Sequence, residues 1–305
     1  MLTRIISGAV GIVIMAGILF FHDTIVLPIA VAAIIAVMLF ELLRAVKLEK
    51  CFPIFMAVEL CGAAMPFIYS AFHCIEENQK DGETVRVSEI DGAAEAVNSI
   101  YGSVTLIAFA VTLAAAFVIF ATWLRNHKEI RYEQVFFALA AMVLVPQAMS
   151  TMVRIDRMDD ENGLFLLIIG LCGAWIADTG AYFTGVAFGK HKLCPEISPK
   201  KTIEGFIGGI TFTGIAYAAA FSIRGGFSVY TCAVAFVIGA VCAVIGTIGD
   251  LSASMVKRQI GFKDYGKIMP GHGGLMDRFD SVLFVLPTFY IMTALLEETD
   301  IGLLG

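Results

Sequence analysis

The sequence predicts an all-α, polytopic membrane protein with about nine transmembrane helices. Hydrophobic residues make up 58% of the 305 residues and charged residues only 16%, and the mean hydropathy of +0.83 lies above the soluble range. Apolar stretches of roughly 20 residues, enough to cross about 30 Å of hydrocarbon, recur along the chain. No Pro-rich or Ser-rich linker separates soluble domains.

The expected spans follow one another along the whole chain. The first begins after Arg4 and has no small-residue cleavage site before His22 and Asp23, so we expect a retained helix rather than a signal peptide. Each later span is an apolar run bounded by charged residues or turn formers. The predicted spans are 5–21, 25–43, 53–74, 100–124, 134–153, 163–186, 203–222, 228–249 and 279–297.

The distribution of charge orients these spans, because cytoplasmic loops retain Lys and Arg. All but five of the 21 Lys and Arg residues fall on one side, at Arg4 and after the second, fourth, sixth and eighth spans. We therefore predict a cytoplasmic N-terminus and an external C-terminus. The five residues on the outer side are Lys80, Arg86, Arg154, Arg157 and Arg224.

Two other features favour ordinary structural roles. The acidic outer connection at about 75–99 shows little sustained period, so we expect a solvated loop there. The seven cysteines lie mostly within or beside apolar runs and include no C-x-x-C pair, which favours small apolar residues over a disulfide or zinc framework. The net charge is −6, and no nucleic-acid partner is expected.

Candidate functional residues concentrate in the second half of the chain. We divide one continuous membrane domain into residues 1–160, which are membrane helices without a recognisable motif, and residues 161–305, which are catalytic helices and cytoplasmic loops. Three polar cytoplasmic segments mark the second part: 176–192, 198–209 and 249–280.

Asp178 lies about eight residues before the cytoplasmic end of the sixth span, or about 12 Å below it. A carboxylate at that depth costs several kcal/mol unless it is paired, hydrated or bound to metal, so it is a functional candidate. The alternative is a structural Asp that bonds a neighbouring helix.

The segment SPKKTIEGFIGG predicts a helix start, with Ser198 as N-cap and Pro199 at the first helical position. Lys200 and Lys201 then fall in the first turn, where cations oppose the helix dipole, which indicates a polyanion above them. The positive-inside rule and contact with anionic lipid explain the same lysines equally well.

The last polar segment shifts the balance toward a phosphate and metal site. Asp250, Ser254 and Lys257 share one face of a helix by spacing, and so do Asp277 and Asp280. Carboxylates with lysines suit Mg²⁺ and phosphates. Zinc is disfavoured because His272 has no Cys or His partner nearby. The histidine itself is either structural, or it orients a carboxylate or donates to a phosphate.

The same segment resembles the signature of the phosphatidate cytidylyltransferases, also called CDP-diacylglycerol synthases. The segments DTGAYFTGVAFGKHKL and SPKKTIEGFIGG are also similar to that family, so the likeness covers roughly 165–290. One departure is Met269, where the family usually has Ile or Leu before the proline. The matching positions are Ser254, Lys257, Arg258, Lys263, Asp264, Pro270, Gly271, His272, Gly273, Gly274, Asp277, Arg278 and Asp280.

The resemblance implies transfer of CMP from CTP to phosphatidic acid at a cytoplasmic site, with Mg²⁺ and a second, monovalent cation such as K⁺. It implies Asp250 and Asp277 as leading metal ligands, with Asp178 and Asp280 as further ones. It also allows a homodimer. Catalytic roles would extend to Lys257, Asp264 and His272, and substrate contacts to Lys200, Lys201, Ser254, Arg258, Lys263 and Arg278.

Two alternatives stay open. Buried Asp residues in glycine-rich helices also mark the cation pathways of ion-coupled transporters. No inverted repeat is visible, however, and the polar residues gather on one side of the membrane. The second alternative is a membrane cytidylyltransferase or phosphotransferase that acts on a different lipid phosphate.

Overall fold

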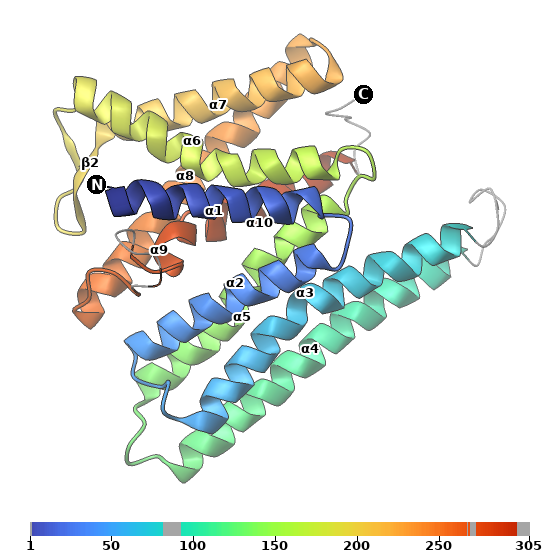
Figure 1. Ribbon diagram of the computed structural model, residues 1–305, viewed down its shortest axis with the longest axis vertical. Coiled ribbons are helices and arrows are strands. Elements are labelled where there is room, and N and C mark those ends of the chain that lie inside the picture. Colours follow the sequence, from blue (N-terminus) through green and yellow to red (C-terminus); the bar gives the residue numbers. More distant parts are fainter. Residues whose placement is uncertain (1, 82–92, 267, 269–272, 298–305) are drawn as a thin grey trace. The chain divides into compact units, whose positions relative to one another are not determined.

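The computed structural model describes the chain apart from residues 1, 82–92, 267, 269–272 and 298–305, and apart from the side chains of 2–6, 72–81, 93–103 and 297. The described chain is helical except for one two-stranded sheet and the connections (Figure 1). Its residues form two compact units, one of residues 10–157 and one of residues 1–9 and 158–305.

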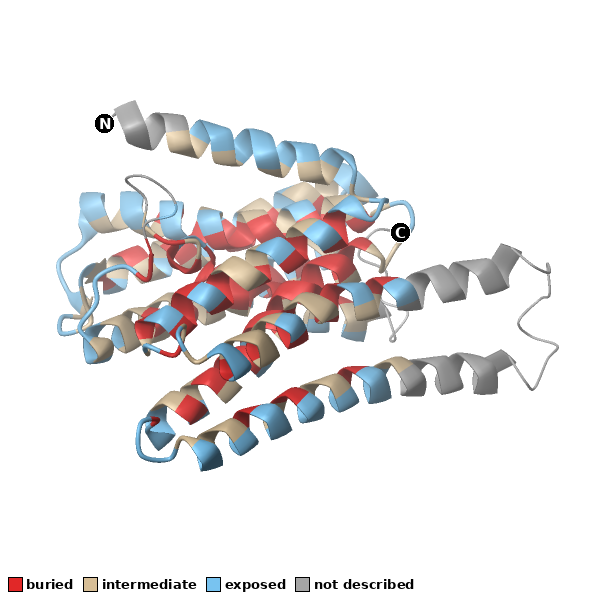
Figure 2. Cartoon of the chain, turned by 60° about the horizontal axis from the view of Figure 1, so that its bottom comes forward, coloured by how far each residue is buried: buried red, intermediate tan, exposed pale blue. Residues whose placement is uncertain are grey.

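The unit of residues 10–157 is a helix bundle in which α2 contacts α3 and α5, and α4 lies along α3 (Figure 1). Leu27, Val31 and Ile35 form a fully buried stripe on α2, as the helical period requires. In contrast, the described part of α4, residues 104–125, is mostly exposed (Figure 2), which suits a helix that faces lipid. The helices are α1 (Leu2–Phe20), α2 (Val26–Ala45), α3 (Phe52–Asp81), α4 (Ala93–Arg125) and α5 (Tyr132–Asp156).

The unit of residues 158–305 holds all three polar segments. In it, α6 packs against α7, α7 against α8, and α8 against α10. Its elements are α6 (Gly163–Phe188), β1 (Lys192–Cys194), β2 (Ser198–Thr202), α7 (Ile203–Gly225), α8 (Val229–Ile260), α9 (Met276–Phe279) and α10 (Val282–Glu297).

Glycines let these helices approach closely. A Cβ placed on Gly205 would lie 2.6 Å from the Ala181 carbonyl oxygen, and one on Gly209 would lie 2.8 Å from that of Ala177. The backbones of α6 and α7 are therefore in near contact, as is common where small residues line membrane helix interfaces. On α8, a Cβ placed on Gly249 would lie 3.0 Å from the carbonyl oxygen of Asp280, so these two segments are also close.

The predicted helix start at Ser198 and Pro199 is wrong. Residues 198–202 form strand β2, which pairs antiparallel with β1, and Thr202 caps α7 by accepting a 3.1 Å hydrogen bond from the Gly205 backbone. A long-range contact explains the difference. His191 Nδ1 lies 2.7 Å from Glu204 Oε1, and the Ile203 N–H donates to the His191 carbonyl oxygen, so the hairpin closes on the first turn of α7.

Eight of the predicted spans are confirmed as helices long and apolar enough to cross a membrane. The first corresponds to α1, whose described apolar part, Ser7–Phe20, is shorter, so this span stays a prediction. Several boundaries differ. The third helix continues to Asp81 and the fourth begins at Ala93, so both ends of the stretch 75–99, which was expected to be a loop, are helical. The eighth helix continues 11 residues past 249 to Ile260, and the last span begins at Met276 and is interrupted between Phe279 and Val282. The orientation also stays a prediction.

Candidate active site

Three carboxylates from different elements come together in the unit of residues 158–305. Asp178 comes from α6, Asp250 from α8, and Asp280 from the end of α9. The charge of Asp250 acts on both other carboxylates. The Ser281 hydroxyl joins them as well, because it lies 3.5 Å from Asp178 Oδ2 and 3.4 Å from Asp280 Oδ1, within reach of donating to either. The predicted convergence of polar segments therefore occurs for these residues.

Two lysines balance this negative charge. Lys201 Nζ lies 2.5 Å from Asp250 Oδ2, so strand β2 is tied to α8. Lys257 Nζ lies 2.8 Å from Asp277 Oδ1 and 3.9 Å from Asp280 Oδ2. Because these side chains are mostly buried, their attraction is screened less than that of a surface pair.

Asp277 binds two backbone N–H groups of the connection that follows α8. Its Oδ2 accepts 2.9 Å hydrogen bonds from the backbone N–H groups of Tyr265 and Gly274, while Oδ1 accepts the one from Lys257. Gly273, at φ 91°, adopts a left-handed conformation beside this carboxylate. Asp277 is therefore linked to Asp280 through Lys257, and Asp280 in turn is near enough to Asp250 for their charges to repel.

Tyr265 is also hydrogen-bonded back to α8. Burial raises the pKa of its hydroxyl, and the charges of Asp277 and Asp280 raise that pKa further. The hydroxyl consequently stays protonated and donates to the Ala253 carbonyl oxygen at 3.2 Å. The Lys257 ammonium lies 5.4 Å from the centre of the ring, within cation–π range.

A cavity of about 440 Å³ opens beside Asp178 and Lys201. Its wall is cationic at the hairpin, where Lys192 and Lys200 lie, and apolar along Tyr182, Val186 and Phe206. Asp178 is exposed to this cavity although it sits within a membrane helix. The cavity can therefore take a molecule that is anionic at one end and apolar along another side.

The carboxylates fit a hydrated or phosphate-bound cation better than a fully enclosed one. Mg²⁺ usually takes one or two protein carboxylates and completes its octahedral shell with water and substrate oxygens. Ser281 lies between Asp178 and Asp280, and Asp250 is near enough for its charge to repel both, a repulsion that a cation would relieve. Of the three carboxylates, Asp178 lines the cavity, where such ligands have room. Asp277 accepts three hydrogen bonds, and a carboxylate has about four lone-pair sites, so one remains.

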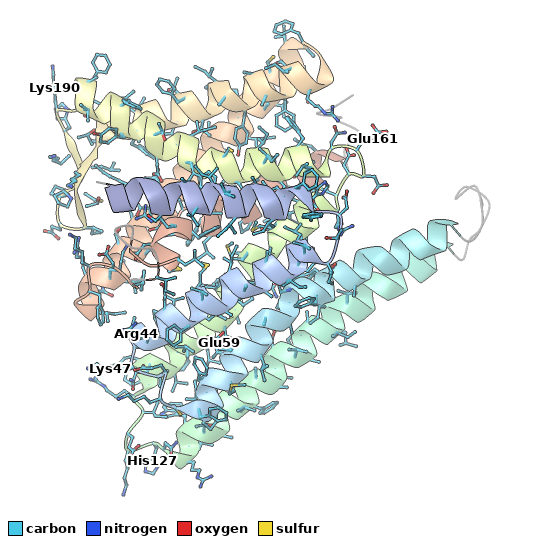
Figure 3. The ribbon with its side chains drawn as sticks, viewed as in Figure 1. Arg44, Lys47, Glu59, His127, Glu161 and Lys190 are labelled. Carbon is cyan, nitrogen blue, oxygen red and sulfur yellow. The ribbon has the colours of Figure 1, made fainter. Side chains whose placement is uncertain are left out.

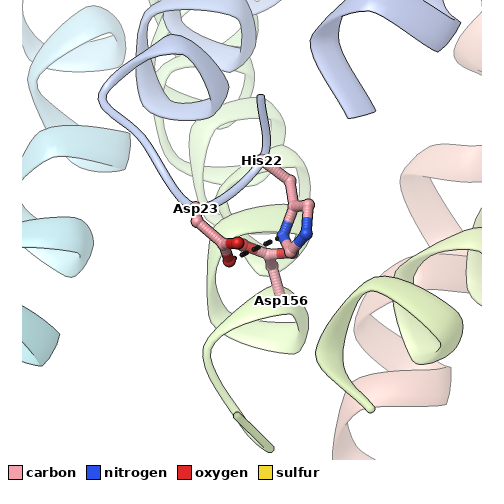
Figure 4. A group of neighbouring side chains, drawn as sticks. All are labelled: His22, Asp23 and Asp156. Atoms are coloured by element: carbon pink, nitrogen blue, oxygen red, sulfur yellow. Dashed lines mark hydrogen bonds and ion pairs between the residues drawn. The ribbon is translucent and has the colours of Figure 1, made fainter. Parts of the chain in front are cut away.

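A different group meets the geometric requirement for direct ligation among the described residues. The ligand atoms of His22, Asp23 and Asp156, in the unit of residues 10–157, all lie within 4.8 Å of one another (Figure 4). His22 Nδ1 is 3.0 Å from Asp23 Oδ1 and 2.8 Å from Asp156 Oδ1, which is the geometry of a charged hydrogen-bonded cluster. It ties the turn after α1 to the end of α5.

The other predicted site residues occupy varied positions. Ser254 Oγ is 3.4 Å from Asp250 Oδ1, as the helical spacing indicated. Lys200, Arg258, Lys263, Asp264 and Arg278 are exposed, and His272 lies outside the described residues. The sequence reasoning missed Lys192, Tyr265 and Ser281. Their positions next to motif residues gave a weak signal, but their roles depend on contacts between distant elements.

Comparisons with known proteins agree on one family. Residues 2–296 match the model of the cytidylyltransferase family. The chain is 32% identical over 298 residues to the phosphatidate cytidylyltransferase of Bacillus subtilis, an alignment that covers 96% of this chain and 97% of that protein. It is 42% identical over 133 residues to that of Staphylococcus haemolyticus and 39% over 132 residues to that of Aquifex aeolicus, covering 43% of this chain in each case and 50% and 48% of those proteins.

Proposed function

This chain belongs to the cytidylyltransferase family, and on that premise we propose that it acts as a phosphatidate cytidylyltransferase. It transfers the CMP unit of CTP to phosphatidic acid, and the products are CDP-diacylglycerol and pyrophosphate. The observation that carries this conclusion is the match to the Bacillus subtilis enzyme over nearly the full length of both chains.

The reaction needs no nucleophile from the protein. A phosphate oxygen of phosphatidic acid forms a bond to the α-phosphorus of CTP, and the bond from that phosphorus to the oxygen bridging to the β-phosphate breaks. Pyrophosphate leaves with the electron pair. The protein therefore has to hold two anions together, orient them and offset their repulsion.

Carboxylates hold the metal in this proposal. Asp178, Asp250 and Asp280 would bind Mg²⁺ directly or through water, and Asp277 would contribute its remaining lone pair while it orders the loop. Asp264, near Gly273, would orient the water shell. When bound, Mg²⁺ neutralises phosphate charge and fixes the orientation of the reacting groups. A second, monovalent cation such as K⁺ would bind at the same carboxylates.

Cationic side chains bind the substrates. Lys200 and Lys201 line the cavity, so they would reach a phosphate placed beside Asp178. Lys257 would hold Asp277 and Asp280 in place and share its charge with the transferred phosphate. Ser254, Arg258, Lys263 and Arg278 would contact the triphosphate or the lipid phosphate, and His272 would orient a carboxylate or donate to a phosphate.

The location follows from the two substrates. CTP is a cytosolic solute, whereas the acyl chains of phosphatidic acid leave the bilayer only at a large hydrophobic cost. The active site would therefore lie at the cytoplasmic face of the cell membrane, and residues 161–305 would carry the chemistry. A cavity with a cationic end and an apolar side supports this placement. The chain would work as a homodimer.

The purified protein in mixed micelles should convert radiolabelled CTP and phosphatidic acid to CDP-diacylglycerol when Mg²⁺ is present. EDTA should abolish product formation, because without a divalent ion the phosphate charges are not neutralised. Excess Mg²⁺ should restore product formation. Thin-layer chromatography of the lipid product measures the result.

A competing lipid phosphate, such as a polyprenyl phosphate, is the control for the acceptor. Faster labelling of that lipid than of phosphatidic acid would contradict the proposed substrate. Full activity in EDTA would contradict the metal site.

A further inference from the structure

A second hollow lies where α4 ends and α5 begins, in the unit of residues 10–157. We call it the turn pocket. It encloses about 370 Å³, and none of the residues proposed for CMP transfer lines it. Because α4 and α5 both cross the membrane, the turn between Arg125 and Tyr132 lies at a membrane surface. Its lining consists of Trp123, Leu124, His127, Lys128, Ile130, Arg131 and Tyr132.

The polar wall of the turn pocket is cationic. Lys128 and Arg131 are exposed, and no carboxylate lines the pocket. Lys128 forms no ion pair within the part of the chain that the structure describes, whereas Arg131 contacts Glu133 at 2.9 Å, a solvent-exposed pair that is weakly bound. His127 lies at this turn, at the same end of the unit as Arg44 and Lys47 (Figure 3).

The other wall is apolar and aromatic, and the backbone behind it is fixed. The Trp123 indole N–H donates to the carbonyl oxygen of buried Ile130 at 3.0 Å, which closes the turn. Leu124 is 74% exposed and Tyr132 60% exposed, so both present apolar surface at the edge of the hydrocarbon core. Trp and Tyr are the residues enriched at that level of a membrane.

We propose that the turn pocket binds an anionic phospholipid of the surrounding bilayer, with the headgroup phosphate at Lys128 and Arg131 and an acyl chain along Leu124 and Tyr132. Basic pockets between transmembrane helices are suited to acidic headgroups, and each nearby Lys or Arg strengthens the attraction. A soluble phosphate would use the cations but leave the apolar wall exposed. The pocket's shape and charge therefore favour a lipid.

Native mass spectrometry of the full-length protein, released from nanodiscs, tests this assignment. The probe is phosphatidylglycerol mixed equally with phosphatidylcholine, because neither is the proposed substrate. Wild-type protein should retain phosphatidylglycerol preferentially. Lys128→Gln should lower its occupancy about fivefold, while Lys128→Arg should retain it.

The matched control is Lys50→Gln, which removes an exposed lysine from another turn between membrane helices, and it should leave occupancy unchanged. Asp250→Asn should also retain the lipid, so failure of the lipid site can be distinguished from failure of the proposed reaction. Equal retention of phosphatidylcholine, or no effect of Lys128→Gln, would overturn the proposal. Displacement of the lipid by millimolar inorganic phosphate would instead indicate a soluble-anion site and overturn the headgroup assignment.

Discussion

Asp277 connects the end of α8, the loop that follows it and the start of the last span through two oxygen atoms. Replacing it with Asn removes the charge that faces buried Lys257 and leaves a single acceptor oxygen for three donors. We predict that Asp277→Asn lowers kcat at least about a hundredfold, the scale of losing one preorganised electrostatic contact. A steady-state assay with saturating CTP measures this.

Loss of folding could imitate that result, so a second variant is needed. Asp250 pairs with Lys201 and Ser254 but, among the described residues, holds no loop N–H group, so Asp250→Asn should reduce kcat to a similar extent with a smaller fall in the thermal midpoint than Asp277→Asn. Glu196→Gln, an exposed change in the hairpin turn, is the matched control. Near-normal turnover in Asp250→Asn would remove this residue from the proposed metal ligands.

For single residues, the sequence predicted that carboxylates and lysines gather at the candidate site, but not which contacts hold each side chain in place. Asp250, Ser254 and Lys257 could be placed on one face because helical spacing is local. The role of Ser281 could not be predicted, because it depends on α6 lying beside the α9–α10 junction. The pairing of Lys201 with Asp250 likewise requires the hairpin fold.

At the scale of the elements, α6 and α7 approach closely at Gly209. Gly209→Leu should lower the stability of the protein by about 1–3 kcal/mol, because the added side chain has no space against the Ala177 carbonyl oxygen. A lower midpoint of thermal unfolding in detergent, followed by circular dichroism, checks this prediction.

Gly17→Leu is the matched control, because a Cβ there meets no described atom within 4 Å. It should leave the midpoint within error of the unmodified protein. Equal midpoints for both variants would show that the close approach of α6 and α7 is not needed for stability.

The sequence was enough to predict the membrane-spanning helices, but not the structure of the polar segments that follow them. An apolar run of about 20 residues has the length needed to cross the bilayer, and eight predicted spans are therefore found as helices in the structure. The continuation of α8 to Ile260 was missed because its polar residues end the apolar run without ending the helix. The hairpin was missed because Ser198 and Pro199 fit a local capping rule, which the contact between His191 and Glu204 overrides.

At the scale of the whole molecule, the predicted orientation awaits a test. Glu161 and Lys190 lie at opposite ends of α6 (Figure 3), so the turns beside them face opposite sides of the membrane. In a background without native cysteines, Glu161→Cys should react with an impermeant maleimide in intact cells. Glu196→Cys, in the hairpin, should react only after permeabilisation.

The two cysteines control for each other, because each is exposed and replaces a glutamate. The reverse labelling pattern would invert the orientation and place the lysine-rich hairpin outside the cell. Such a result would contradict a cytosolic nucleotide site as well as the positive-inside argument.

The length of α8 has a consequence for the enzyme. Its 32 residues extend about 48 Å, well beyond a hydrocarbon core of about 30 Å. Its apolar part, which ends at Gly249, accounts for about 31 Å of that length, so the last turns of α8 extend past the hydrocarbon. Asp250 is therefore placed at the boundary of the bilayer and Lys257 about 10 Å further out, where a water-soluble nucleotide and the phosphate of a membrane lipid can both reach them.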